Sequence, residues 1–224
     1  MQPYFLPYIG YWQLINLVDQ FVIYDDVDFI KGGYINRNSL LVNKSNFLFT
    51  LSLKKSSTNK KINEIFLGDI NFKILKTIKQ SYKKAPFFND VFPLIEDIFC
   101  YEEKNLALFI SYSLKKISKY LNIDTDFIFS SSLNYNKESS AENKVINICK
   151  ILNSNNYVNS YGGLFLYNKD NFIKQNIVLS FLKTNKYSYR QFKNPFVSNL
   201  SIIDIIMFND IIDTTKLLNN YKLL

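Results

Sequence analysis

The opening fourteen residues, MQPYFLPYIGYWQL, restrict the backbone more than any other stretch of this chain. Pro3 and Pro7 each fix a backbone dihedral angle, and Gly10 is the permissive residue at which the segment can enter a helix. Five aromatic rings lie within the first twelve residues, unlike a polar tail, and the positively charged start of a secretory signal is missing. We therefore expect an ordered aromatic turn that leads into a short amphipathic helix over residues 11–20.

The length and composition predict one compact, folded unit. A chain of 224 residues with 47% hydrophobic and 17% aromatic residues can bury a substantial core and is unlike a disordered chain. No apolar run approaches the roughly 18–20 residues needed to span a bilayer. We expect a single domain over residues 1–224, without a membrane span and located in the cytoplasm.

The net charge of +8 rests almost entirely on lysine, since Arg37 and Arg190 are the only arginines. Lysine, Asn, Ile, Phe and Tyr all have A/T-rich codons, so a biased genome could produce this balance. Guanidinium groups, the favoured side chains for reading bases and phosphates, are scarce. The lysines occur in dispersed pairs, which is typical of solvated faces. We therefore favour attraction of phosphorylated small molecules over nucleic-acid binding.

The chain contains no histidine, which excludes Ser-His and Cys-His nucleophilic machinery and removes a usual zinc ligand. Any acid–base chemistry must use Asp, Glu, Lys, Tyr or groups of the substrate. Cys100 and Cys149 lie far apart without CxxC spacing, and we expect both to be reduced, buried thiols.

The run FVIYDDV, residues 21–27, is typical of a buried strand that ends in two aspartates. Ligands of open α/β sheets bind beyond the carboxyl ends of the strands, which makes Asp25 and Asp26 candidate site residues. A turn with a capping aspartate is the alternative, and the sequence does not decide between the two.

The rest of the chain alternates strand and helix patterns. A hairpin is predicted over residues 40–53 with its turn at 43–46, and a lysine-rich loop over 54–64. Further strands are predicted at 125–133, 156–167 and 177–183, and helices at 71–82, 89–100, 105–123, 139–153 and from 201 onward. The expected fold is mixed α/β: a mostly parallel, Rossmann-like sheet flanked by helices, with a β-hairpin insertion and a helical C-terminus.

Several segments, in this order and over almost the whole chain, resemble the WbqC-like family. They are MQPYFLPYIGYWQLI, FVIYDDVDFIKGGYINRN, KTIKQSYKKAPFF, FIFSSSL, NSYGGLFLY and NPFVSNLSIIDIIMFN. The resemblance implies a bacterial protein encoded among O-antigen or related lipopolysaccharide genes. It also implies transfer of an acyl or aminoacyl group to a nucleotide-linked amino sugar. In two respects the chain departs from the family pattern: Met1 stands where members carry a short strand before QPYF, and residues 129–131 lack a usual charged residue.

A weaker resemblance is to nucleotidylyltransferase-like folds and to amide ligases built like pantothenate synthetase. The order of Pro3, Pro7, Gly10, a helix and FVIYDD is similar, but Tyr11 stands where those enzymes place histidine. In such folds the helix N-terminus supplies N–H groups to phosphate, and glycine permits close approach. An ATP-dependent amide ligase, detectable by amino-acid-dependent pyrophosphate exchange, therefore stays an alternative.

With the transferase as the leading hypothesis, each candidate residue receives an expected role. Asp25 or Asp26 orients the amine or acts as base, and Arg37 grips a phosphate or carboxylate. The substrate-binding candidates, which would read hydroxyls, stack on rings or offer amides, are Gln2, Tyr4, Tyr8, Gly10, Tyr11, Asn36, Asn38, Ser131, Gly162, Gly163 and Tyr167. The alternatives are ordinary packing for the tyrosines and an ion pair with Asp25, Asp26 or Asp28 for Arg37.

The expected partners are a nucleotide sugar and an activated acyl donor, with the donor, the sugar and a homo-oligomer left open. No cofactor is assigned; the paired aspartates could hold Mg²⁺ around a diphosphate, but two adjacent carboxylates are a weak signal. A non-catalytic protein that binds sugar nucleotides or assembles the same pathway is the rival from another functional class.

Overall fold

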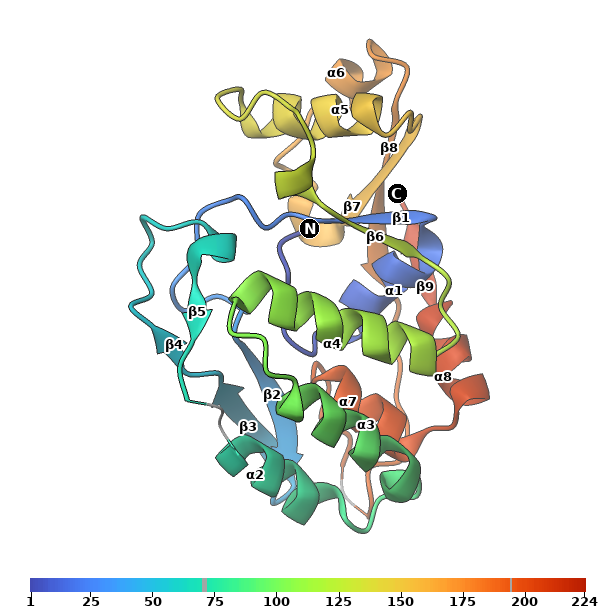
Figure 1. Cartoon of the computed structure of the whole chain (residues 1–224). Helices are drawn as coiled ribbons and strands as arrows, with labels where there is room; N and C mark the ends of the chain where they lie inside the picture. The colour runs from blue at the N-terminus through green and yellow to red at the C-terminus, as the bar shows by residue number, and fades with distance from the viewer. Residues whose placement is uncertain (70–71, 194) are drawn as a thin grey trace.

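A computed structural model describes residues 1–69, 72–193 and 195–224, and Figure 1 shows the course of the chain. The α-helices are α1 (Ile9–Leu17), α2 (Phe72–Tyr82), α3 (Phe88–Cys100), α4 (Leu106–Tyr120), α5 (Ala141–Ile151), α6 (Lys169–Ile173), α7 (Ile202–Phe208) and α8 (Ile211–Leu218). The strands are β1 (Gln20–Ile23), β2 (Arg37–Val42), β3 (Ser45–Thr50), β4 (Leu53–Lys54), β5 (Phe66–Leu67), β6 (Asp126–Phe129), β7 (Asn156–Ser160), β8 (Val178–Thr184) and β9 (Tyr221–Leu223). Short 3₁₀ turns span Ile62–Glu64, Ser130–Ser132 and Tyr161–Gly163.

The mixed α/β class is confirmed, but the large parallel sheet is not formed. Within the described ranges the strands make four small sheets, and the largest has three strands. β1 pairs in parallel with β6, β2 with β3 and β4 with β5 pair antiparallel, and β8 pairs with β7 in parallel and with β9 antiparallel. The expectation of a mostly parallel, Rossmann-like sheet is therefore wrong. Buried apolar runs indicate strands, but they do not say which strands pair.

The expected strands are also shorter than their apolar runs. Of the runs at 21–27 and 125–133, only residues 21–23 and 126–129 are paired, because both segments turn into polar contacts at Asp25 and Ser130. The predicted hairpin is confirmed, with Asn43 and Lys44 in the left-handed region at its turn. Local sequence can specify this pairing, because only two residues connect the two strands of the hairpin.

Most helices begin and end near the predicted bounds. Pro93 lies inside α3, within its first turns, and Asn105 caps α4 by accepting hydrogen bonds from two backbone N–H groups. The helix expected from residue 201 divides, because Asp210 caps a second helix after Asn209. The predicted first residue of the 71–82 helix lies outside the described residues.

The opening segment is built into the centre of the molecule. Leu6 adopts a left-handed conformation with φ of 48°, and its carbonyl accepts hydrogen bonds from Asn38 Nδ2 at 2.7 Å and Ser201 Oγ at 2.8 Å. The Phe5 ring packs against Phe49 and Phe99, which belong to a hairpin strand and to α3. This turn therefore joins three distant parts of the chain.

The described residues form two apolar cores. The larger surrounds the opening segment and α1 to α4, and Trp12 and Tyr11 are fully buried within it. The smaller lies between α5, α6 and the β7–β8 strands, in the upper part of Figure 1, and includes Cys149 and Phe172. Burial raises the pKa of the Cys149 thiol to about 11. Cys100 is exposed, so the expectation that both thiols are buried is wrong for it.

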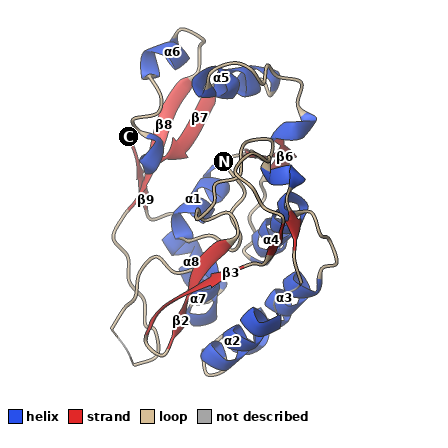
Figure 2. Ribbon diagram, turned by 90° about the vertical axis from the view of Figure 1, so that its left-hand side faces the viewer, coloured by secondary structure: helices blue, strands red, loops and turns tan. Residues whose placement is uncertain are grey.

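Helix α4 lies across the middle of the molecule, with the β1–β6 pair on one side and the β2–β3 hairpin and α2 on the other (Figures 1 and 2). In the described ranges, no helix combines the length and the apolar character that crossing a bilayer requires.

Candidate functional site

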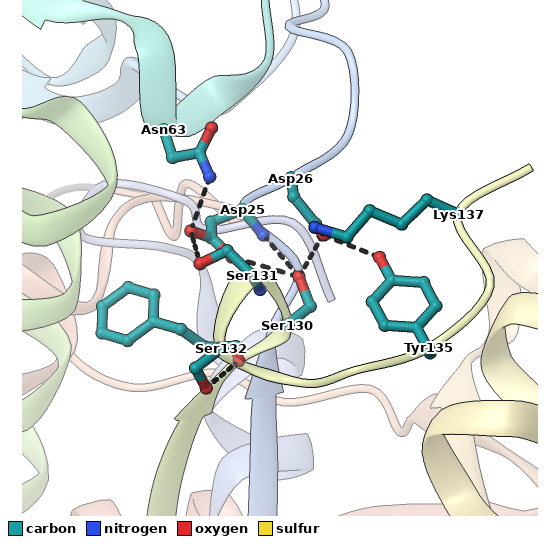
Figure 3. Close-up of polar contacts among 9 residues, drawn as sticks. Asp25, Asp26, Asn63, Ser130, Ser131, Ser132, Tyr135 and Lys137 are labelled. Atoms are coloured by element: carbon teal, nitrogen blue, oxygen red, sulfur yellow. Dashed lines mark hydrogen bonds and ion pairs between the residues drawn. The ribbon is translucent and has the colours of Figure 1, made fainter.

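The parallel pairing of β1 and β6 brings two polar segments to the same edge. Ile23 is paired with Phe129, so Asp25 and Asp26 leave β1 where Ser130 and Ser131 leave β6. Figure 3 shows the carboxylates and hydroxyls of these four residues pointing toward one another. The expectation that the aspartates lie at the carboxyl end of a parallel strand is confirmed.

Asp25 is buried, and both of its carboxylate oxygens are occupied by donors. Oδ1 accepts the backbone N–H of Ser131 at 3.0 Å, and Oδ2 accepts Ser131 Oγ at 2.7 Å and Asn63 Nδ2 at 3.1 Å. A backbone hydrogen bond holds Asn63 beside Asp25, because the Asn63 N–H donates to the Asp25 carbonyl at 3.0 Å. A carboxylate bound this fully holds the two strand ends and the 62–64 turn together.

Asp26 is bound by three donors from the segment that follows β6. Its Oδ1 accepts Tyr135 OH at 2.8 Å and Ser130 Oγ at 2.5 Å, and its Oδ2 forms an ion pair with Lys137 Nζ at 2.8 Å. The Ser130 hydroxyl has one proton and lies 3.1 Å from Asp25 Oδ1, so the shorter contact assigns that proton to Asp26.

The protonation state of Asp26 follows from this surrounding. Burial raises the pKa of its carboxyl, but the hydrogen bonds from Lys137, Ser130 and Tyr135 and the charge of Lys137 outweigh burial and leave the pKa below its ordinary value. Asp26 is therefore ionised at neutral pH. Its side chain is only 6% exposed, whereas that of Lys137 is 51% exposed, so the ammonium covers the carboxylate.

A group of tyrosines connects this edge with β7. The hydroxyls of Tyr24 and Tyr135 lie near one another, and the Tyr167 hydroxyl lies near Tyr157 and Asn159 of β7. Burial raises the pKa of each of these two tyrosines, so their hydroxyls stay neutral at physiological pH. The hydroxyls offer donors and acceptors of the kind that sugar hydroxyl groups need.

The glycines after β7 have different surroundings. A Cβ on Gly163 would lie 2.8 Å from Asn159 Nδ2, so this glycine lets the Asn159 side chain lie close to the backbone. Gly162 is exposed, and a Cβ placed on it would have its nearest neighbour, Ser160 Oγ, 4.0 Å away. Their expected contact with an anion stays a prediction.

Several other predicted residues have their polar groups engaged inside the fold. Asn36 Nδ2 donates to the Leu51 carbonyl at 2.9 Å, and Asn38 Nδ2 donates to the turn at Leu6. Tyr11 is fully buried, its hydroxyl donates to the Gln2 carbonyl at 2.9 Å, and the Tyr4 ring stacks on it. For Tyr4 and Tyr11, the geometry matches ordinary packing, which was the alternative to ligand contact.

Tyr8 and Gly10 lie at the start of α1. Tyr8 is 37% exposed, and a Cβ on Gly10 would lie 2.6 Å from the Tyr8 ring and 2.9 Å from Thr184 Oγ1. Gly10 therefore permits close packing of α1 against β8.

Arg37 lies on β2, and its guanidinium contacts the turn that precedes this strand. Its Nη2 donates to the Gly32 carbonyl, and its guanidinium lies over the Tyr34 ring at 5.7 Å. The alternative of an ion pair with Asp25, Asp26 or Asp28 is not formed, because Arg37 belongs to no ion pair among the described residues. Arg37 and the two aspartates are not brought into contact.

Sequence reasoning missed Asn63, Tyr135 and Lys137. Each lies in a polar stretch without periodicity, and no local pattern indicates which carboxylate it reaches. The described part of the chain holds no group of three or more His, Cys, Asp or Glu side chains suited to a metal ion. Around Asp25 and Asp26 the partners are hydroxyl, amide and ammonium groups.

The fold and this edge define a mixed α/β protein with a polar cluster where two parallel strands end. The chain belongs to the WbqC-like protein family, whose sequence profile matches residues 2–215. A protein of Mycobacterium tuberculosis (strain ATCC 25618 / H37Rv), named "Uncharacterized protein Rv1507c", is 24% identical to it over 211 residues. That similarity covers 92% of this chain and 90% of the mycobacterial protein. No solved structure gives a significant match.

Proposed function

We propose that this protein is a transferase that attaches an acyl or aminoacyl group to the amine of a nucleotide-linked amino sugar in O-antigen or related surface polysaccharide synthesis. The observation that carries the proposal is the ion pair of Asp26 and Lys137. Asp26, ionised and assisted by Tyr135, already binds a primary ammonium group at 2.8 Å. The protonated amine of an amino sugar is the same kind of cation.

Binding would proceed by exchange of one ammonium group for another. Lys137 is the exposed member of the pair, so a diphosphate arriving at this edge would attract its ammonium. The sugar amine would then take its place on Asp26, and the hydroxyls of Tyr24 and Tyr167 would contact sugar hydroxyls. Asp25 keeps the strand ends in register through Ser131 and Asn63.

The transfer step forms one bond and breaks another. The protonated amine first gives its extra proton to solvent, and the neutral nitrogen attacks the carbonyl carbon of the activated donor, so that a C–N bond forms. The bond from that carbon to the leaving group then breaks, the leaving group departs with the electron pair, and it takes up the second proton released by the nitrogen. Because the pKa of Asp26 is below its ordinary value, this carboxylate is suited to orienting the amine rather than to removing its proton.

Support for a non-catalytic sugar-nucleotide-binding protein comes from the full set of donors around both carboxylates. Such a set needs no reaction to explain it. The two functions are separated by incubating the protein with a UDP- or dTDP-linked amino sugar and activated acyl thioesters, with Asp26→Ala as the comparison. Acylated sugar nucleotide that disappears in the folded variant supports the transferase; sugar-nucleotide binding without product from any donor contradicts it.

A further inference from the structure

A groove of about 600 Å³ lies away from the Asp26 edge, between the turn of the β2–β3 hairpin, the end of α2 and the loop at residues 192–193. Leu41 and Phe192 form its apolar part, and the ammonium-bearing side chains of Lys44, Lys83, Lys84 and Lys193 line it. In Figure 1, the β2–β3 hairpin and α2 lie on the opposite side of α4 from the β1–β6 pair. The dispersed lysines of the sequence thus converge here from three segments.

The groove is fixed from beneath by one buried carboxylate. Asp204, fully buried in α7, accepts hydrogen bonds from Tyr82 OH at 2.8 Å and from Gln191 Nε2 at 2.6 Å. The Tyr82 hydroxyl in turn accepts the backbone N–H of Leu41 at 2.8 Å. The hairpin, the end of α2 and the loop beside Phe192 are therefore held in one arrangement before any ligand binds.

The charges of the groove are uncompensated. No Asp or Glu lines it, and none of its four lysines belongs to an ion pair among the described residues. Four ammonium groups around one concavity raise the local concentration of anions. Lysine binds phosphate as a point charge, and Leu41 and Phe192 offer contact to a planar or apolar group.

We propose that this groove is a second ligand site, which binds a small phosphorylated molecule with a planar part, of the nucleoside diphosphate class. Its volume suits such a ligand, since small-molecule pockets are typically about 300–1,000 Å³. A nucleic acid is disfavoured because neither arginine of the chain lines the groove. This inference does not depend on the proposed transferase activity.

The test is titration of the full chain with UDP, inorganic pyrophosphate and uridine by calorimetry at low salt. We expect UDP to bind more tightly than pyrophosphate or uridine, and added salt to weaken UDP binding by screening. In Lys83→Gln/Lys84→Gln the UDP affinity falls roughly tenfold. In the matched control Lys115→Gln/Lys119→Gln, which removes the same charge from the exposed face of α4, the affinity is unchanged.

Two further variants separate this groove from the Asp26 edge. Phe192→Ala lowers the UDP affinity but leaves pyrophosphate binding intact, and Asp26→Asn leaves UDP binding intact. The inference is overturned if UDP does not bind, if the two double variants weaken binding equally, or if only Asp26→Asn abolishes binding. It is also overturned if a single-stranded oligonucleotide binds through Lys83 and Lys84 more tightly than UDP, since the groove would then be part of a nucleic-acid surface.

Discussion

The ammonium of Lys137 lies 2.8 Å from Oδ2 of Asp26, and the two residues come from segments more than a hundred positions apart. The pair closes the edge formed by the ends of β1 and β6. Because Asp26 is nearly buried and Lys137 is half exposed, the ion pair is both a structural contact and the outer surface of the candidate site.

Replacing Lys137 by Gln should lower the free energy of unfolding by about 1 kcal/mol at pH 7, since the pair is only partly screened by solvent. The pKa of the Asp26 carboxyl in the folded protein lies below its ordinary value. The pair therefore stabilises the fold fully at pH values above the pKa of the unfolded state, which is about 3.9. It is lost as the pH falls through the folded pKa. Urea unfolding of both proteins between pH 7 and pH 3 should therefore show a difference that shrinks below about pH 4.

Lys119→Gln is the control for that series, because Lys119 is exposed on α4 and belongs to no ion pair among the described residues. A difference between the wild type and Lys137→Gln that is the same at pH 3 and pH 7 would contradict the role assigned to Asp26.

Asp25→Asn should be far more costly than its small change in size indicates. The amide can accept at only one of the two oxygen positions, so either the backbone N–H of Ser131 loses its acceptor, or Ser131 Oγ and Asn63 Nδ2 both lose theirs. We expect a loss of about 2–4 kcal/mol in the free energy of unfolding, measured by urea denaturation. Asp28→Asn breaks only an exposed ion pair with Lys61 and should cost less than about 1 kcal/mol. Equal losses would contradict the assignment.

Asn38→Ala tests whether the opening segment is held by the hairpin. The variant removes the donor to the Leu6 carbonyl and the acceptor for the Ser39 N–H, both buried. The expected loss is about 2–3 kcal/mol in the free energy of unfolding. Asn16→Ala, which removes one exposed hydrogen bond to Asn219, should change it by less than about 0.5 kcal/mol. A neutral Asn38→Ala would show that the turn at Leu6 does not need this clamp.

Gly10→Ala should destabilise the protein although it lies in a helix. Alanine is favoured over glycine in helices by about 1 kcal/mol, but its Cβ would lie 2.6 Å from the Tyr8 ring and 2.9 Å from Thr184 Oγ1. We expect a net loss of up to about 2 kcal/mol, measured by thermal and urea unfolding. Gly162→Ala is the matched control, because its added Cβ would enter open space, and it should leave the free energy of unfolding nearly unchanged. The reverse order would contradict the close packing of α1 on β8.

The sequence predicted the parts of this structure that depend on local pattern. The run FVIYDD indicated a strand that ends in carboxylates, and two β-rich runs around Asn43 and Lys44 indicated the hairpin. Pairing between distant strands has no local signal, so one parallel sheet was expected where the described residues form four small sheets.

The same reason explains the site. Asp25 and Asp26 were identified from their position after a strand, but Tyr135 and Lys137 reach Asp26 only through tertiary folding. Asn38 was expected to read hydroxyl groups of a ligand, and in the structure its amide nitrogen donates to the Phe5 and Leu6 carbonyls. A polar side chain in a motif can serve a ligand or a strained turn, and only the partners distinguish these roles.

The central claim is that Asp26 binds the amine of a nucleotide-linked sugar. The most direct measurement is calorimetric titration with a UDP-linked amino sugar and the matching UDP-linked sugar that carries a hydroxyl in place of the amine, for the wild type and Asp26→Asn. The account predicts that the wild type prefers the amino sugar by roughly tenfold, the value of a charge-assisted contact, and that Asp26→Asn binds the two equally. Equal affinity of the wild type for both sugars, or a preference that Asp26→Asn retains, would contradict it.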